Sequence, residues 1–296
     1  MCCSSPVSCC AFILGSELPS ASSEEQRCPQ RTVKVRMGGL SGWSGSMLAL
    51  LLIFSMQTGN GLVNAAGPPD CSFIQSFPSV EPSGVYTIQP DGFSYSFQVY
   101  CQMGANGLWT VIQKRTGGAV AFDREWAAYK NGFGFVSWDH WLGLEKISAM
   151  TKSKRWKLRV DLWDFEGGSA YAEYEDFRVG DESTNYRLSV GRYRGTAGDA
   201  IKGEYPGINQ NGFGFSTFDR DSDGCNPCIF GDIAINSCTD FDRGGWWYSK
   251  CGSASLNGDW HPKGDNIGWS SGLHWRTWKG PAPYSAKATR MMITPM

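Results

Sequence analysis

The chain has 296 residues, of which 41% are hydrophobic, so it is long enough to bury a full core. Its 37 glycines, 14 prolines and 13 tryptophans are typical of a loop-rich, aromatic domain and exclude a helical bundle. The formal net charge is −1; leaving out residues 1–65 gives 23 basic and 25 acidic side chains, which excludes a basic surface for nucleic acid or acidic membranes.

Residues 1–66 are expected to be a leader. The apolar run MLALLLIFSM at 47–56 precedes small residues at 63–66, which is typical of a secretory signal, and it is shorter than the about 20 residues of a membrane span. Residues 1–36 are Ser-rich with scattered cysteines, so we interpret them as a gene-model extension and 37–66 as the signal; a long natural leader is the alternative. The mature protein is then secreted and extracellular.

Six cysteines remain after the leader, an even number that is typical of disulfides in a secreted protein. Many pairings are possible, and proximity in the sequence favours Cys71–Cys101, Cys225–Cys228 and Cys238–Cys251. Loop-closure entropy assigns about 3.6, 1.9 and 2.9 kcal/mol to these three bridges, so the short Cys-x-x-Cys bridge is expected to shape a loop. A redox motif or a zinc site is the alternative, which fits poorly with secretion.

Strands are predicted where apolar and polar residues alternate at period two between Gly, Asn and Asp turns. Such segments occupy residues 84–88, 97–103, 108–113, 155–164, 170–179, 186–192 and 288–293. The first three are expected to form a small N-terminal sheet pinned by the first disulfide. The next three are expected to form a central sheet, with a hairpin turn at 166–168.

Two short helices are predicted between these sheets. Residues 123–129 have an acidic start followed by helix formers, and residues 141–150 have apolar side chains at helical spacing. Beyond Gly195 regular patterning nearly vanishes for about 90 residues, which indicates a functional loop region. The sequence has no heptads and no internal repeat, so it lacks an obvious oligomerisation stalk.

The loop region contains three acids at alternate positions, Asp219, Asp221 and Asp223. Calcium takes six to eight oxygen ligands, so alternate carboxylates helped by backbone carbonyls suit this ion and suit zinc poorly. An EF-hand is disfavoured, because with Asp219 at position 1 the bidentate Glu of position 12 is Phe230. A solvated acidic turn without metal is the remaining alternative, since Asp and Ser are ordinary turn formers.

Other residues of chemical interest are few. Trp246 and Trp247 lie in an aromatic run and are expected to pack in the core. Of the three histidines, His140 is expected to be structural, whereas His261 and His274 are candidates for a ligand face. The sequence has no Gly-x-Ser-x-Gly or His-Glu-x-x-His motif, and we predict that the protein is not an enzyme.

Several short motifs occur in a fixed order along residues 70–296. They are DC at 70–71, GVY at 84–86, GLWTVIQKR at 107–115, WLGL at 141–144, FSTFDRDSD at 215–223, GWW at 245–247, LNG at 256–258, YS at 284–285 and MMI at 291–293. In this order the sequence resembles the fibrinogen C-terminal domain family. The resemblance implies an α+β fold with a small N-terminal sheet, a central twisted antiparallel sheet with short helices, and a loop-rich C-terminal calcium and ligand subdomain.

The resemblance also implies a calcium site. In the family, two Asp side chains and two backbone carbonyls further along the loop hold the ion, and water completes the shell. The matching positions are Asp221 and Asp223 by side chain and Cys225 and Pro227 by carbonyl, with Asp219 as a supporting acid behind them. The short disulfide would hold the two carbonyls in place, and the expected affinity is that of extracellular modules, about 10⁻⁴ to 10⁻³ M.

Ficolin-like members of the family have an acetyl-binding pocket beside the calcium site, with a cis peptide that by position is Ser237–Cys238. The matching pocket positions are Cys238, Phe241, Asp242, Gly252, Trp269 and Ser270. This sequence departs from the acetyl-binding pattern, because Gly252 replaces the usual histidine and Asp242 replaces an aromatic residue. The resemblance therefore predicts a pocket here and leaves acetyl specificity open.

These observations predict a secreted, calcium-dependent, lectin-like recognition protein that binds glycans or acetylated surface groups in innate immune recognition. The alternative is an extracellular-matrix or receptor-binding protein that uses the same loops against a protein partner. No nucleic-acid partner and no membrane span are expected. Weak single-site binding needs several copies for avidity, so a homo-oligomer is one expected arrangement.

Overall fold

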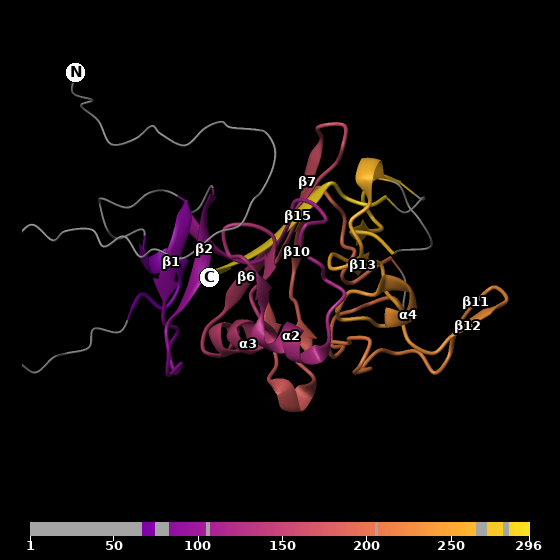
Figure 1. Ribbon diagram of the computed structural model, residues 1–296, viewed down its shortest axis with the longest axis horizontal. Coiled ribbons are helices and arrows are strands. Elements are labelled where there is room, and N and C mark those ends of the chain that lie inside the picture. The colour runs from indigo at the N-terminus through magenta and orange to yellow at the C-terminus, as the bar shows by residue number, and fades with distance from the viewer. Residues whose placement is uncertain (1–66, 75–82, 105–106, 205–206, 265–270, 281–283) are drawn as a thin grey trace, which may run out of the picture. The chain divides into compact units, whose positions relative to one another are not determined.

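A nine-stranded antiparallel sheet forms the centre of the structure. The structure is a computed structural model, and it describes residues 67–74, 83–104, 107–204, 207–264, 271–280 and 284–296 (Figure 1). The strands of the sheet are β1 (Gly84–Ile88), β2 (Phe97–Gly104), β3 (Gly107–Arg115), β4 (Phe133–Gly134), β5 (His140–Trp141), β6 (Trp156–Trp163), β7 (Ser169–Tyr174), β10 (Tyr193–Gly195) and β15 (Ala288–Pro295). Seven of them follow the order β1-β2-β3-β15-β6-β7-β10, and the β4–β5 hairpin is attached to β3.

The last strand of the protein, β15, lies in the middle of this sheet. It pairs with β3 on one side, where Thr289 faces Arg115, and with β6 on the other, where Met291 faces Val160. The sequence predicts two sheets, but β15 joins them into one, because its backbone groups satisfy the free edges of both β3 and β6. The α+β class is confirmed.

Residues 186–192 form less strand than predicted. Only β9 (Leu188–Ser189) forms there, and it pairs with β8 (Arg178–Val179) outside the main sheet. The reason is a left-handed turn, since Asn185 and Tyr186 have φ values of 53° and 50°. Alternate side chains of the segment are still buried, which explains the period-two pattern in the sequence.

The helices are short. They are α1 (Cys71–Ile74), α2 (Trp126–Asn131), α3 (Leu144–Lys152) and α4 (Thr239–Asp242), with 3-10 turns η1 (Glu182–Thr184) and η2 (Pro262–Gly264). Helices α2 and α3 confirm the two predicted helices, although each begins three residues later than predicted. No helix within the described ranges combines the length and the apolar character that crossing a bilayer requires.

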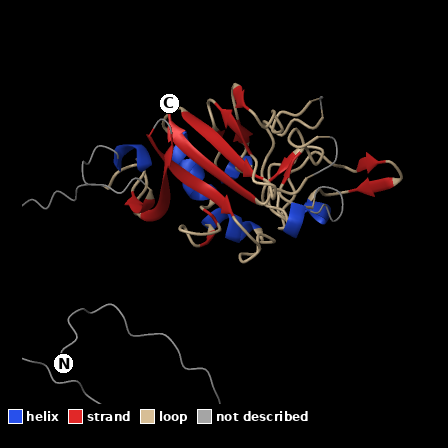
Figure 2. Ribbon diagram, turned by 90° about the horizontal axis from the view of Figure 1, so that it is seen from above, coloured by secondary structure: helices blue, strands red, loops and turns tan. Residues whose placement is uncertain are grey.

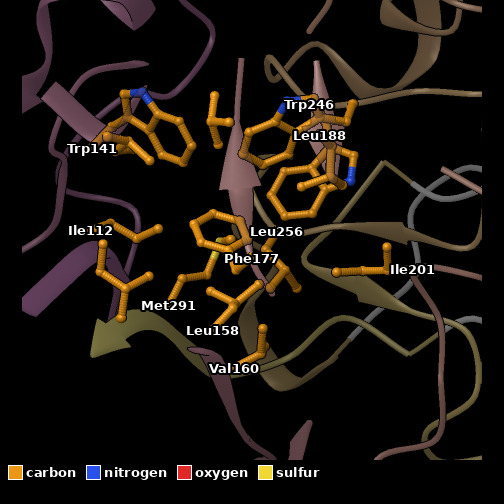
Figure 3. Close-up of a cluster of buried hydrophobic side chains, with 14 of the residues drawn as sticks. Ile112, Trp141, Leu158, Val160, Phe177, Leu188, Ile201, Trp246, Leu256 and Met291 are labelled. Atoms are coloured by element: carbon orange, nitrogen blue, oxygen red, sulfur yellow. The ribbon is translucent and has the colours of Figure 1, made fainter. Parts of the chain in front are cut away.

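Aromatic side chains fill the core beside the sheet. Trp141, Trp246 and Trp247 are at most 1% exposed, which confirms the prediction that the tryptophan pair packs inside. The ring of Trp247 lies 5.1 Å from that of Phe215 and 5.3 Å from that of Trp246, both edge-on. Figure 3 shows Trp141 and Trp246 in the buried cluster to which Met291 of β15 also belongs.

The described parts of residues 196–287, namely 196–204, 207–264, 271–280 and 284–287, contain little regular structure, as predicted (Figure 2). The strands in this region are β11 (Cys228–Phe230), β12 (Ile233–Ile235), β13 (Ala254–Ser255) and β14 (His274–Trp275). Two buried side chains of β3 hold the region against the sheet: Gln113 Nε2 donates to the Leu256 carbonyl at 2.7 Å, and Arg115 Nη1 donates to the Gly258 carbonyl at 2.8 Å. The sheet therefore supplies a fixed base for the loops.

Candidate functional site

The acidic loop, residues 216–224, is fixed through its backbone. Ser216 N donates to the Trp246 carbonyl at 2.8 Å, and Trp246 N donates back to the Ser216 carbonyl at 3.1 Å. At the other end Gly224 N donates to the Ser249 carbonyl at 2.6 Å. Since Trp246 and Ser249 are fully buried, the acids of the loop are presented from a rigid base.

Asp223 connects the acidic loop to the predicted pocket. Its Oδ1 accepts the N–H of Cys225 at 2.8 Å, and its Oδ2 accepts the N–H of Cys238 at 2.7 Å. Cys238 directly precedes α4 and forms the disulfide with Cys251. One carboxylate therefore holds two backbone segments that are far apart in the sequence.

Asp221 lies next to Asp223 and affects its charge. Asp221 Oδ1 accepts the N–H of Asp223 at 3.0 Å, while the Asp221 side chain is exposed. Partial burial raises the pKa of Asp223, the two N–H donors oppose that rise, and the neighbouring Asp221 carboxylate adds to it. The two carboxylates repel each other, and a cation bound to both would remove this repulsion.

The donor set of the loop fits a hard divalent cation. A carboxylate offers about four lone-pair positions, so Asp223 keeps acceptor capacity beyond its two N–H partners. Oxygen donors from carboxylates and carbonyls are the ligands that calcium prefers. Asp221 and Asp223 are therefore suited to hold the ion, and the part played by the carbonyls of Cys225 and Pro227 stays a prediction.

Asp219 has a structural task. Its Oδ1 accepts the N–H of Trp126, the first residue of α2, at 2.9 Å and the hydroxyl of Thr217 at 2.7 Å. The residue before α2, Glu125, makes no side-chain cap, so Asp219 supplies that cap from across the fold. The predicted role of Asp219 behind the calcium ligands stays a prediction.

The structure contains the disulfides Cys71–Cys101, Cys225–Cys228 and Cys238–Cys251. The last two lie side by side, because Cys225 Sγ is 3.6 Å from Cys238 Sγ and 3.7 Å from Cys251 Sγ. These cysteines are bonded in pairs and offer no thiolate to a zinc ion. The Cys225–Cys228 bridge, which follows the acidic loop, is thus in contact with the Cys238–Cys251 bridge beside the predicted pocket.

One expectation about the backbone is wrong. Among the described residues the cis peptide bond is Asn226–Pro227, and the Ser237–Cys238 bond is trans. A cis bond before a non-proline residue costs about 3 to 4 kcal/mol. Here the N–H of Cys238 already reaches Asp223 with the bond in trans, so the contact between loop and pocket needs no such isomer.

The predicted pocket residues lie only partly within the described ranges. Cys238 precedes α4 and Asp242 ends it, both are buried, and Gly252 follows the second cysteine. Trp269 and Ser270 lie outside the described residues, as does the side chain of Phe241. The described part of the pocket is therefore the α4 segment and the disulfide beside it.

Gln210 occupies the space beside Gly252, and the sequence did not indicate it. Gly252 has a φ of +72°, and a Cβ there would lie 2.2 Å from Gln210 Nε2. Gln210 is fully buried; its Nε2 donates to the Ala254 carbonyl at 2.7 Å, and its Oε1 accepts Trp246 Nε1 at 3.4 Å. The amide of Gln210 therefore fills the space into which a larger residue at position 252 would extend.

Asp242 is a buried acid without a full set of partners. It is 3% exposed, and its Oδ1 has no hydrogen-bond partner in the part of the protein that the structure describes. Burial raises the pKa of this carboxyl well above its ordinary value, and the charge of Asp259 adds to the rise. An unpaired buried acceptor favours a ligand that brings a hydrogen-bond donor.

The two candidate histidines are buried in this structure. Burial lowers the pKa of His274 to about 4, with a further contribution from Arg276. His261 Nε2 lies 3.0 Å from Ser271 Oγ. Neither ring is presented to solvent, which is against a role at a ligand face, whereas His140 is structural as predicted, with Nδ1 2.9 Å from the Trp138 carbonyl.

Comparisons with known proteins agree with this fold. The profile of the family described as "Fibrinogen beta and gamma chains, C-terminal globular domain" matches residues 68–296. Angiopoietin-4 of Bos taurus is 40% identical over 227 residues, which are 76% of this chain and 42% of the relative. Fibrinogen C domain-containing protein 1 of Homo sapiens is 41% identical over 219 residues, 72% of this chain and 44% of the relative. The protein thus matches less than half the length of these relatives.

Solved structures give the same result. The fibrinogen-like globe domain of human ANGPTL6 superposes with a TM-score of 0.69 at 36% identity, covering 78% of this chain and 97% of that domain. A lamprey fibrin D-dimer, complexed with the peptide ligand Gly-His-Arg-Pro-amide, has a TM-score of 0.69 at 33% identity and covers 78% of this chain and 74% of its own.

Proposed function

This protein belongs to the family of the C-terminal globular domains of fibrinogen beta and gamma chains, and on that premise we propose that it is an extracellular, calcium-dependent recognition protein. The observation that carries the proposal is the position of Asp223, whose two oxygens accept the N–H of Cys225, directly after the acidic loop, and the N–H of Cys238 at the pocket. An ion bound by this carboxylate would fix the loop and the pocket together.

Asp221 and Asp223 would bind the ion through their side chains, and the carbonyls of Cys225 and Pro227 would complement them. Bound calcium would neutralise the two neighbouring carboxylates and lower the pKa of Asp223. Asp219 would support the calcium site without contacting the ion, because it connects the acidic loop to the first turn of α2. The binding of a ligand would then depend on calcium through the order of the α4 segment.

The first candidate ligand is a glycan or an acetylated surface group, in innate recognition. The pocket would be formed by Cys238, Phe241, Asp242, Gly252, Trp269 and Ser270. The resemblance to ficolin-like members of the family supports this candidate. Such sites bind weakly one at a time, so several copies would act together.

The second candidate is an extracellular protein, and Asp242 favours it. A buried carboxyl with one unpaired oxygen prefers an N–H or a cationic group to an acetyl methyl group. Gln210 also fills the space beside Gly252, where the acetyl-binding pattern has a histidine. The lamprey fibrin relative holds a peptide that contains arginine, and a peptide of that chemistry suits Asp242.

Calcium binding is tested by calorimetric titration of the chelator-treated protein. We expect a Kd of about 10⁻⁴ to 10⁻³ M. With a Kd of about 0.5 mM, about 5 mM calcium adds about 1.4 kcal/mol to the free energy of unfolding and raises Tm by about 3 to 6 °C. The Asp221→Ala variant should lose both effects without a change of fold, because this side chain is exposed.

Asp232→Ala is the matched control, since Asp232 is an exposed acid outside the acidic loop, and it should keep both effects. Wild-type protein that gives neither calcium heat nor a rise in Tm would eliminate the calcium site. A glycan array with and without calcium then separates the two ligand classes. Calcium-dependent hits on sugars or N-acetyl groups support the first candidate, and an array without hits supports the second.

A further inference from the structure

The β11–β12 hairpin projects from the loop region beyond α4 (Figures 1 and 2). The two strands form a sheet of their own, in which Ile229 faces Ala234 and Cys228 faces Ile235. Each strand has its main contact with the other and not with another element. Within the described ranges the hairpin is therefore joined to the domain mainly at its base.

The base of the hairpin is anchored, while its strands are exposed. Cys228 and Ile235 are buried, and the disulfide to Cys225 fixes the start of β11. Ile229 is 65% exposed and Ile233 is 56% exposed. An isolated two-stranded hairpin is marginally stable, and large apolar side chains in water do not stabilise it. Exposed apolar side chains on a projecting element are instead typical of an interaction site.

Both long edges of the hairpin are open among the residues that the structure describes. The sheet consists of β11 and β12 alone, so each strand has a neighbour on one side only. An open edge presents N–H and C=O groups that can pair with an added strand. Extended peptides bind to such edges through backbone hydrogen bonds, with alternate side chains reading the two faces.

Acidic side chains outnumber basic ones on and beside the hairpin. Residues 221–242 contain five aspartates and no Lys, Arg or His; Asp242 is buried among them, and the exposed Arg243 follows directly. Asp232 in the turn and Asp240 after the hairpin are exposed, and neither belongs to the acidic loop. Arg220, which precedes this stretch, is engaged elsewhere, since it donates to Asn185 at 2.6 Å and stacks on Trp126. A partner should therefore carry positive charge.

We propose that the β11–β12 hairpin docks an extended segment of a partner protein in which apolar and basic residues alternate. The segment adds as a strand to an open edge, places its apolar side chains against Ile229 or Ile233, and places its basic side chains near Asp232 and Asp240. The apolar part of this surface, Ile229 and Ile233, lies on the hairpin and outside the α4 segment of the pocket, whereas Asp240 belongs to that segment. Docking on the hairpin goes beyond the proposed function and does not require a ligand in the pocket.

Two other occupants fit less well. A second copy of the protein would bring Asp232 and Asp240 toward the same acids, and the eight residues Cys228 to Ile235 are far fewer than the about 20 to 30 per side of a stable interface. An anionic lipid surface would also repel these acids. An extended basic segment satisfies the open edge, the exposed isoleucines and the charge together.

The test begins with a phage library of random twelve-residue peptides, selected on the full-length protein in calcium buffer. We expect enriched peptides that alternate Val, Ile or Phe with Lys or Arg. A synthetic copy of the dominant peptide should bind the Ile229→Ser/Ile233→Ser variant at least tenfold more weakly than wild type. The matched control is Phe135→Ser/Trp138→Ser, a pair of similar exposure (70% and 69%) on another hairpin, which should bind as wild type does.

Two further arms decide between strand addition and other occupants. A copy of the peptide N-methylated at alternate residues should lose at least tenfold in affinity, and Asp232→Lys should weaken binding about tenfold. Equal binding of parent and hairpin variant, or of plain and methylated peptide, overturns the proposal. Two other results also overturn it. If the isoleucine substitutions abolish self-association in sedimentation velocity, the occupant is a second copy of the protein. If they abolish binding to phosphatidylcholine–phosphatidylserine vesicles, the occupant is a lipid surface. The calcium-induced rise in Tm is measured on every variant, so failure of the calcium site is distinguished from failure of the hairpin.

Discussion

At the scale of single residues, Asp242 is buried and has an unpaired oxygen, and this affects how the stability of the protein depends on pH. Its pKa in the folded state is raised above the value of about 3.9 in the unfolded state. Between these two values the folded state keeps a proton that the unfolded state has lost. The free energy of unfolding therefore decreases as the pH rises through this window.

The Asp242→Asn variant removes this titration and keeps the size of the side chain. We expect the difference in Tm, variant minus wild type, to be larger at pH 7.5 than at pH 4.5 by at least about 3 °C, which corresponds to about 1 kcal/mol. Other groups, such as His274 with its lowered pKa, titrate equally in both proteins and cancel in the difference. Parallel Tm curves across this range would show that Asp242 is not held neutral.

Gly252 and Gln210 give a second prediction at this scale. Gly252→His places a side chain at a left-handed φ and against Gln210, so we expect a loss of about 2 kcal/mol or more in the free energy of unfolding. Gln210→Gly opens the space, and the double variant should lose about 1 kcal/mol less than the sum of the single losses. Urea unfolding of the four proteins measures this coupling, and strictly additive losses would contradict the described contact.

At the scale of elements, α2 depends on an acid that is distant in the sequence. Asp219 lies 93 residues from Trp126 and accepts its N–H. Asp219→Ala should therefore lower the free energy of unfolding by about 2 kcal/mol, because a cap and a charged hydrogen bond are lost together. Asp221→Ala in calcium-free buffer is the control and should change it by less than about 0.5 kcal/mol. Equal losses of unfolding free energy in both variants would show that Asp219 does not stabilise α2 as a cap.

The sequence predicts elements whose signal is local. Period-two alternation locates β1, β2, β3 and β6 within a few residues, and helical spacing locates α3, because burial of one face imposes these periods. Non-local contacts leave no such signal. The cap from Asp219, the amide of Gln210 beside Gly252 and the turn at Asn185 all depend on partners elsewhere in the fold, so the sequence misses them or assigns them another role.

At the scale of the whole molecule, β15 connects the first half of the sheet to the second. Its residue Ile293 is fully buried, while Ile229 on the β11–β12 hairpin is exposed. Ile293→Ala should lower the free energy of unfolding by about 2 to 4 kcal/mol, since it leaves a cavity in the core. Ile229→Ala should change it by less than about 0.5 kcal/mol, and equal losses in denaturant titrations would contradict this placement of β15.

The calcium ligands could be named from the sequence only through a resemblance, because alternate acids also occur in ordinary turns. The structure adds what the residues alone do not give, namely the bond from Asp223 to the amide of Cys238. That bond joins residues 15 positions apart, and no pattern in the sequence specifies it. Through this bond the acidic loop contacts the pocket at Cys238 while the Ser237–Cys238 peptide is trans.

The contact between two disulfides has a consequence for how this protein is made. Cys225 Sγ lies within 3.7 Å of both Cys238 Sγ and Cys251 Sγ. During oxidative folding, a thiolate at one of these cysteines can therefore attack a disulfide formed by the others, and the pairing can change. Because the two distances are nearly equal, they favour neither Cys238 nor Cys251 as the partner of Cys225. Material produced without a disulfide isomerase should contain scrambled isomers of equal mass, and peptide mapping under non-reducing conditions is required to separate them from the native form.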